Sequence, residues 1–157
     1  MFKALFRTPR DFAILWVRLA LGASLLPHGL EKLGVFDEDK GIGEAMSDAA
    51  AFMAQATGTP EWAGYLGIAA EVLGSIALIL GFFGRFCALS IGALMAVAAW
   101  KVGGLEAGEV LTWWRDTPGA TTYGSYHLLA VGAALAIVVR GSGALSIDRR
   151  IAPRPMP

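Results

Sequence analysis

Four long apolar segments alternate with shorter polar ones along the chain. They lie at residues 12–33, 62–83, 86–102 and 123–139, and each has the roughly 17–25 residues that a helix needs to cross a hydrocarbon core. Because backbone groups in lipid must pair internally, and no short alternating strands are visible, we expect helices. The pattern predicts an all-α, integral membrane four-helix bundle with antiparallel neighbours.

The connection between the first two segments is long for a helical bundle. Its middle, GEAMSDAAAFMAQ, has the pattern of an amphipathic helix, so we expect a short interfacial helix within Gly41 to Thr57, in the first external loop. No repeat or second domain is visible. We therefore expect residues 1–157 to form a single four-span transmembrane domain.

Charged residues divide between the two sides of the predicted bundle. Basic residues dominate on the side that holds both termini: Lys3, Arg7, Arg10, Arg85, Arg140, Arg149, Arg150 and Arg154. The first external loop is acidic instead. By the positive-inside rule, we expect a multi-pass protein of the cell inner (plasma) membrane with both termini cytoplasmic.

Composition agrees with a membrane protein and excludes some chemistry. Hydrophobic residues make up 55% of the chain and charged residues 17%, with a mean hydropathy of +0.56, whereas soluble domains have about 25% charged residues. The net charge of zero gives no reason to expect nucleic acid as a partner. Cys87 is the only cysteine, which excludes an internal disulfide, a CxxC pair and a four-cysteine zinc site.

Two charges, Arg18 and Glu71, fall inside the predicted spans. A lone charge in mid-bilayer costs at least about 2.5–3.5 kcal/mol on insertion scales, so we expect the two to pair. One interpretation is an ion pair that only sets the register of the first two helices. The other is the polar floor of a cavity that holds a ligand head group or relays a proton.

A second polar group lies where the first span leaves the membrane. His28 and Lys32 share a helical face with Arg18, Glu31 is the i+3 neighbour of His28, and His127 enters the last span at a similar depth. Two imidazoles with a carboxylate suit a copper or zinc ion, or the axial positions of a haem. The alternative is that each histidine only forms hydrogen bonds at the membrane interface.

Three ordered motifs resemble the DoxX family of small four-helix membrane proteins. They are HGLEKL at residues 28–33, AEVLGSIALILGFFGR at residues 70–85 and GSGALSID at residues 141–148. One position departs from the family: many members carry a Glu at the start of the last span, where this chain has Ser125, followed by Tyr126 and His127. The resemblance implies the four-span fold and an association with redox enzymes, because DoxX itself is the small membrane subunit of a thiosulfate:quinone oxidoreductase.

Two functional hypotheses follow. In the first, the chain is a membrane subunit or partner of a quinone-linked redox system, not catalytic alone, whose pocket opens to the outer leaflet. Its candidate ligand-binding residues are Arg18, His28, Glu31, Lys32, Glu71, Tyr126 and His127. In the second, the chain is a non-catalytic structural or assembly subunit of a membrane complex. Expected partners are the lipid bilayer, membrane or membrane-associated redox proteins, and a second copy of the chain; a transporter is the least favoured interpretation.

Overall fold

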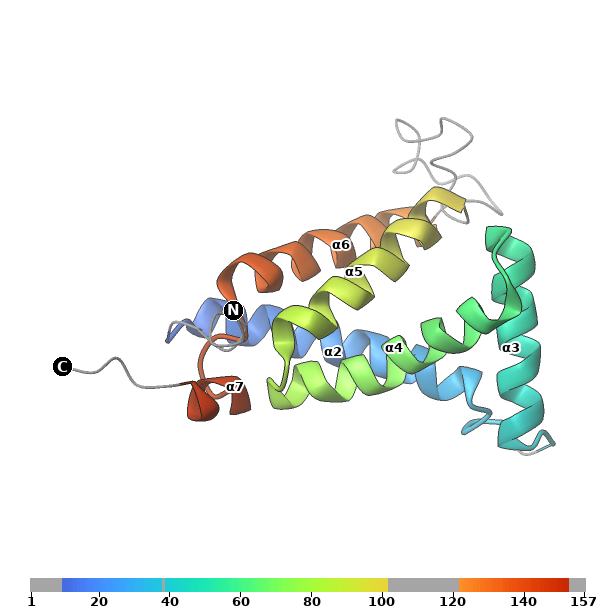
Figure 1. Cartoon of the computed structure of the whole chain (residues 1–157), viewed down its shortest axis with the longest axis horizontal. Coiled ribbons are helices and arrows are strands. Elements are labelled where there is room, and N and C mark those ends of the chain that lie inside the picture. The colour runs from blue at the N-terminus through green and yellow to red at the C-terminus, as the bar shows by residue number, and fades with distance from the viewer. Residues whose placement is uncertain (1–9, 38, 102–121, 153–157) are drawn as a thin grey trace.

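The chain folds into a bundle of long helices with one helix lying across one end. The structure, a computed structural model, describes residues 10–37, 39–101 and 122–152, with only the backbone of residues 122–125. The long helices are α2 (Phe12–Lys32), α4 (Glu61–Leu80), α5 (Gly84–Lys101) and α6 (Thr122–Arg140). Helix α3 (Ile42–Thr57) crosses one end of the bundle, and the short α7 (Ile147–Ile151) lies at the other (Figure 1). We call these the α3 end and the α7 end.

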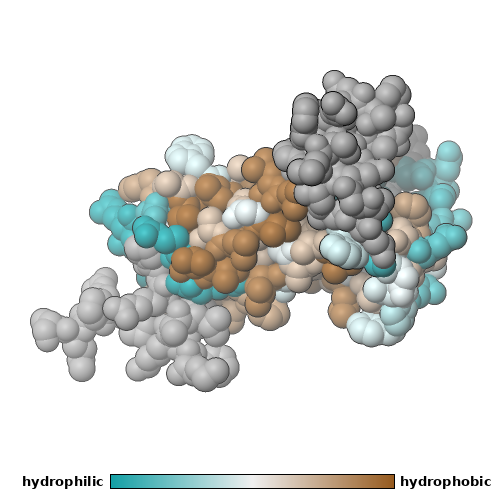
Figure 2. Space-filling view, turned by 90° about the horizontal axis from the view of Figure 1, so that it is seen from above, coloured by the Kyte–Doolittle hydropathy of each residue, from teal (hydrophilic) through white to brown (hydrophobic). Residues whose placement is uncertain are grey.

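The all-α prediction is confirmed, since the described residues contain no strand. Among them, α2, α4 and α5 are long and apolar enough to cross a membrane by length and composition, and α6 contributes a shorter apolar helix over Tyr126–Arg140. Hydrophobic residues gather over the middle of the molecule and hydrophilic ones toward its ends (Figure 2). This distribution suits a bundle whose middle lies in lipid. Lys3, Arg7, Val102 and Arg154 fall outside the described residues.

Capping residues explain where the helices begin and end. Asp11 precedes α2, and its Oδ1 accepts from the backbone N–H groups of Ala13 (3.0 Å) and Ile14 (3.2 Å). The guanidinium of Arg140, 2.8 Å from Asp11, and these N-cap bonds lower the pKa of Asp11 below its ordinary value. Helix α4 stops three residues before the predicted end at 83, because Gly81 adopts a left-handed φ of 68°.

Close backbone approach joins α2 to α4. A Cβ added to Gly22 would lie 3.0 Å from the carbonyl oxygen of Ser75, and one on Gly29 would lie 3.1 Å from the backbone N of Val72. Small residues at helix contacts allow this approach in lipid, where no hydrophobic effect drives helices together. The contact at Gly29 places α2 directly beside Glu71.

Helix α3 is held against α4 by a contact of the same kind. Ala50 is fully buried, and its carbonyl oxygen would lie 2.5 Å from a Cβ added to Gly64. Met53, one turn later on α3, meets Gly67 of α4. The expected short helix within residues 41–57 is thus confirmed, and it packs on α4 through two glycines.

We expect Gly64→Ala to displace α3 and to destabilise the protein by about 1–3 kcal/mol, the usual cost of overpacking. The matched control is Gly132→Ala, because no atom lies within 4 Å of a Cβ at Gly132, and alanine favours a helix over glycine. Thermal unfolding in detergent measures both. Equal melting temperatures for the two variants would contradict the packing of α3 on α4.

At the α7 end, the segment that follows α6 is hydrogen-bonded to the turn between α4 and α5. The carboxylate of Asp148 is buried and accepts hydrogen bonds from the backbone N–H of Phe83 (2.7 Å), the backbone N–H of Gly84 (2.9 Å) and Ser142 Oγ (2.5 Å). Its own backbone N–H donates to the carbonyl of Gly81 (2.9 Å). One short segment therefore fixes the turn between α4 and α5.

Candidate functional site

An ion pair on the facing sides of α2 and α4 forms the centre of the candidate site. Lys32 Nζ lies 2.6 Å from Oε1 and 2.5 Å from Oε2 of Glu71. The Glu71 side chain is 5% exposed and that of Lys32 is 27% exposed. A pair so sheltered from solvent is much less screened than a surface pair, and each charge depends on the other for its stability.

The expected pairing of Arg18 with Glu71 is wrong. Arg18 is almost fully buried, but its Nη2 donates toward the α7 end, to the carbonyls of Ala144 (3.5 Å) and Leu145 (3.3 Å). Helical side chains tilt toward the N-terminus of their own helix. On antiparallel helices, Arg18 and Glu71 therefore point away from each other, whereas Lys32 and Glu71 point toward each other.

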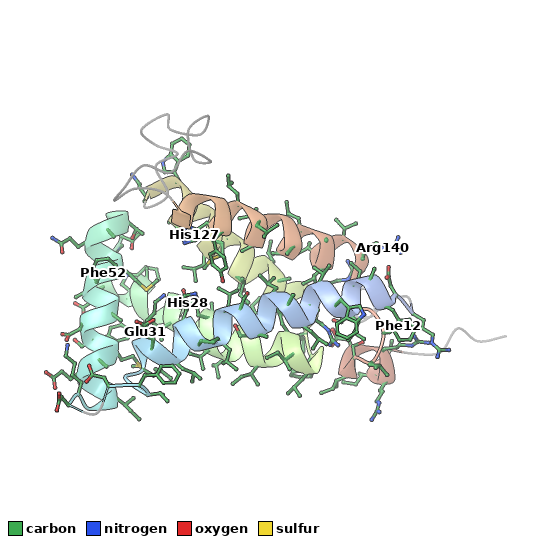
Figure 3. The ribbon with its side chains drawn as sticks, turned by 180° about the vertical axis from the view of Figure 1, so that it is seen from behind. Phe12, His28, Glu31, Phe52, His127 and Arg140 are labelled. Atoms are coloured by element: carbon green, nitrogen blue, oxygen red, sulfur yellow. The ribbon has the colours of Figure 1, made fainter. Side chains whose placement is uncertain are left out.

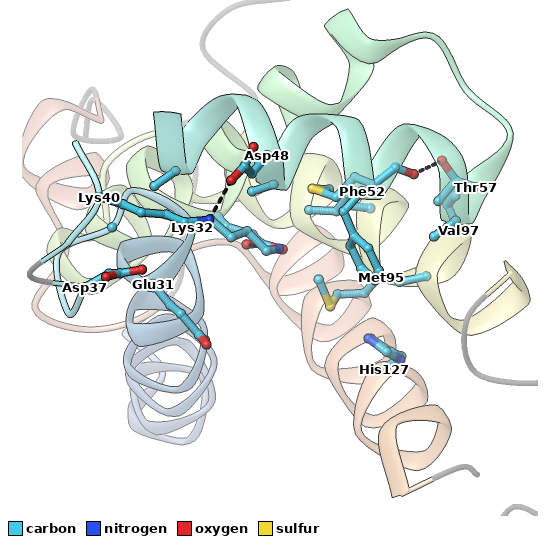
Figure 4. Close-up of a pocket in the computed structure, with 18 residues that line it drawn as sticks. Glu31, Lys32, Asp37, Lys40, Asp48, Phe52, Thr57, Met95, Val97 and His127 are labelled. Atoms are coloured by element: carbon cyan, nitrogen blue, oxygen red, sulfur yellow. Dashed lines mark hydrogen bonds and ion pairs between the residues drawn. The ribbon is translucent and has the colours of Figure 1, made fainter. Parts of the chain in front are cut away.

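A cavity of about 520 Å³ lies between the ion pair and α3. We call it the α3 lobe. Its charged lining comprises Glu31, Lys32, Asp37, Lys40, Asp48 and Glu71. Apolar side chains of α3 and α5, among them Phe52 and Met95, complete its walls (Figure 4).

Lys40 and Asp48 form an ion pair at the rim of the α3 lobe. Lys40 Nζ lies 2.6 Å from Asp48 Oδ2, and both side chains are exposed. The hydrogen bond and charge of Asp48 raise the pKa of Lys40 above its ordinary value. This pair connects the loop after α2 to α3 at the exposed rim of the cavity.

A second cavity of about 610 Å³ adjoins the first at the ion pair. We call it the α6 lobe. It is lined by Leu25, His28, Glu31, Lys32, Glu71, Met95, Tyr126 and His127. The rings of His28 and His127 each lie 5.9 Å from the Tyr126 ring in edge-on contacts. Figure 3 shows His28 and His127 on facing helices at the α3 end, far from Phe12 and Arg140.

The two lobes meet at a shared set of residues: Glu31, Lys32, Glu71, Met95 and His127. Six of the seven candidate ligand-binding residues line the α6 lobe, and the seventh, Arg18, lies at the opposite end of the bundle. That the six bind a ligand stays a prediction. The side chain of Ser125 lies outside the described part of the structure.

Residues of α3 and α5 were missed as part of the site. Among the α3 residues that line the α3 lobe, Ala45, Ala49, Phe52 and Ala56 form an apolar stripe at helical spacing. This stripe is visible in the sequence, but we interpreted the amphipathic pattern only as attachment to the membrane surface. Met95 carries no such signal, because one apolar residue in an apolar span does not reveal which cavity it lines.

The arrangement of these side chains gives little support for a metal site. His28 and His127 line one cavity, as the copper, zinc or haem interpretation requires. Over the described ranges, however, no cluster of three or more His, Cys, Asp or Glu side chains has the geometry to hold a metal ion. The geometry better suits a ligand that accepts hydrogen bonds, since an ammonium, two imidazoles and a phenol converge there.

Comparison with known proteins finds one family. The family model described as DoxX matches residues 13–104, which is more than half of the chain. Lys32 and Glu71 lie within the matched segment, and Tyr126 and His127 lie beyond it. No curated protein and no solved structure matches the chain.

Proposed function

The chain belongs to the DoxX family, and from this premise we propose that it is the membrane partner of a quinone-linked redox system. In this proposal the cavity at the α3 end binds the polar ring of a quinone or quinone-like molecule. The observation that carries the proposal is the Lys32–Glu71 ion pair, sheltered between two cavities with apolar walls. Both volumes lie within the roughly 300–1,000 Å³ of small-molecule sites.

The chemistry of the lining residues supports a quinone. A quinone ring is flat and apolar and has carbonyl oxygens that accept hydrogen bonds. Leu25 and Met95 offer apolar contacts, while Lys32, His28, Tyr126 and His127 offer donors. Imidazoles also exchange protons near neutral pH, as the interconversion of quinone and quinol requires.

The distribution of charged residues supports one orientation of the chain in the membrane. Arg85 and Arg140 begin α5 and end α6 at the α7 end, and Arg149 and Arg150 lie on α7 itself. The α3 end carries acidic residues instead: Asp37, Asp39, Glu44, Asp48 and Glu61. By the positive-inside rule, this distribution supports an orientation with the α7 end in the cytoplasm and the cavity at the outer face of the plasma membrane.

A partner protein completes the proposed reaction. Reduction of a quinone to a quinol takes two electrons and two protons. The residues of the cavity bind the ring and exchange protons, and an associated oxidoreductase supplies or accepts the electrons. The chain thus acts as a subunit or partner, not as an enzyme by itself.

Binding of decylubiquinone to the purified protein tests the proposal. We expect quinones to co-purify in mild detergent, and decylubiquinone to quench tryptophan fluorescence at saturable concentrations. Tyr126→Phe removes one donor and should weaken binding about fivefold, since a hydrogen bond contributes about 1 kcal/mol. Glu71→Gln breaks the charge balance that orients Lys32 and should weaken binding more.

The control is Tyr65→Phe, because the Tyr65 hydroxyl donates to Glu61 (3.2 Å) and lies outside both cavities. Tyr65→Phe should bind decylubiquinone as the unchanged chain does. A protein that carries no quinone, binds no decylubiquinone and holds a stable protein partner would instead establish the structural or assembly subunit.

A further inference from the structure

Different parts of the molecule line the two lobes. Residues that line only the α6 lobe lie on two spanning helices: Leu25 and His28 on α2, and Tyr126 on α6. Charged residues that line only the α3 lobe lie beyond the spanning helices: Asp37 and Lys40 between α2 and α3, and Asp48 on α3. The ion pair Lys32–Glu71 stands at the boundary.

The α6 lobe lies on the flank of the bundle. His28 is exposed, and Ser24, one turn below it, lies 3.5 Å from the Tyr126 hydroxyl across the space between α2 and α6. Leu129, three residues after Tyr126 on α6, is 75% exposed, as expected of a side chain that contacts lipid. A molecule dissolved in the bilayer therefore meets this lobe from the side.

The α3 lobe lies at the end of the bundle. The side chains of Lys40 and Asp48 at its rim are 43% and 59% exposed, and charged side chains at such positions are hydrated. Polar residues continue inward to Lys32, whose side chain is 27% exposed. Water therefore has a polar route from the end of the bundle to the ion pair.

We infer that the two lobes connect the ion pair to two different phases: the α6 lobe admits a lipid-soluble ligand from the bilayer, and the α3 lobe brings water and protons to Lys32 and Glu71. This inference rests on the proposed function for the identity of the ligand. The division into a lipid-facing and a water-facing lobe rests on the geometry alone.

The proton balance of the proposed reaction follows from this division. Each proton that Lys32 Nζ gives to a quinone oxygen breaks one N–H bond and forms one O–H bond. A proton that enters from the outer aqueous phase through the water of the α3 lobe then restores the N–H bond, while the two electrons come from the partner oxidoreductase. Oxidation of a quinol reverses these steps and releases both protons on the side of α3.

Other titratable groups face the ion pair from three sides. They are His28 and Glu31 on α2, Asp37, Lys40 and Asp48 at the α3 lobe, and Tyr126 and His127 on α6. The lining residues of α5 are apolar: Leu94, Met95, Val97 and Ala98. The acidic groups of the α3 lobe provide hydrated proton acceptors along the water-facing route.

Spin labels placed at similar depth in the two lobes test the inference. Cys87→Ala removes the native thiol, and single cysteines are then introduced by Ala98→Cys in the α3 lobe and His28→Cys in the α6 lobe. Ala98 lies three residues from the end of α5 and His28 four residues from the end of α2, or about 5 and 6 Å along the helix axes. A difference in accessibility between the two labels would therefore not come from their depth in the membrane.

After reconstitution into bilayers, each label is exposed to a water-soluble nickel chelate and to molecular oxygen, which concentrates in lipid. We expect the ratio of nickel to oxygen accessibility to be several-fold higher at Ala98→Cys than at His28→Cys. Asp39→Cys is the control for water and Leu129→Cys the control for lipid. A second label at Ala49→Cys repeats the measurement in the α3 lobe if the first variant does not fold.

Each outcome supports or overturns the division into two phases, the quinone function, or both. Equal ratios in both lobes, whether high or low, would overturn the division into two phases. If the ratios differ as expected and decylubiquinone quenches the tryptophan fluorescence of the unsubstituted chain, both proposals are supported. If the ratios differ but the unsubstituted chain binds no decylubiquinone, the division stands and the quinone function fails.

Discussion

Replacing Glu71 by Leu is expected to destabilise the protein by about 3 kcal/mol, because it leaves the charge of Lys32 without its partner. This lies at the lower end of the range for broken buried pairs, since the Lys32 side chain keeps 27% exposure. Replacing Lys32 and Glu71 together by Leu should cost much less, because no charge is then left unpaired. Unfolding in mixed detergent micelles measures the three variants as a double-mutant cycle.

The matched control for this cycle is the pair Lys40–Asp48. Its two atoms lie at nearly the same distance, 2.6 Å, but both side chains are exposed, and exposed pairs contribute little to stability. The coupling between Lys40 and Asp48 should therefore be far smaller than that between Lys32 and Glu71. Additive losses at Lys32 and Glu71 would show that the two charges do not stabilise each other.

Asp148→Ala should have an effect at least as large, at the opposite end of the bundle. The substitution removes the carboxylate that accepts hydrogen bonds from three donors. These are the N–H groups of Phe83 and Gly84 and the hydroxyl of Ser142. Each donor left buried without a partner costs roughly 1–3 kcal/mol, so we expect a loss of about 4 kcal/mol or more. The free energy of unfolding in detergent measures it.

Two further variants locate the cause of that loss. Asp148→Asn keeps one carbonyl oxygen as an acceptor and should lose less than Asp148→Ala. Asp39→Ala removes an exposed carboxylate and should change the free energy of unfolding very little. If Asp148→Ala were as stable as Asp39→Ala, the carboxylate of Asp148 would not be what joins these segments.

The helices could be predicted from the sequence because span length and apolar pattern depend on lipid thickness rather than on neighbours. The gathering of His28, Lys32 and His127 at one level followed from the rise per residue along antiparallel helices. Both inferences use only distances along a helix axis. They hold without knowledge of which helices touch.

The partner of Glu71 could not be found in the same way. The height of an α-carbon does not give the position of the charge, which lies several ångströms away along a long side chain. Arg18 and Lys32 both point toward the start of α2, so Lys32 reaches the level of Glu71 and Arg18 moves away from it. The carbonyls of Ala144 and Leu145 were also invisible as acceptors, because they lie in a turn where Leu145 has a φ of 50°.

The hydrogen bonds of Asp148 can form only after most of the chain has been synthesised. Their donors in the turn between α4 and α5 lie 64 and 65 residues earlier in the chain, and the hydrogen bonds from Arg18 to Ala144 and Leu145 span 126 and 127 residues. Until the last helix has left the ribosome and entered the bilayer, Arg18 and the amides of Phe83 and Gly84 lack these acceptors. The first three spans therefore enter the membrane before these acceptors have been synthesised, and we expect closure of these distant contacts to come late in folding.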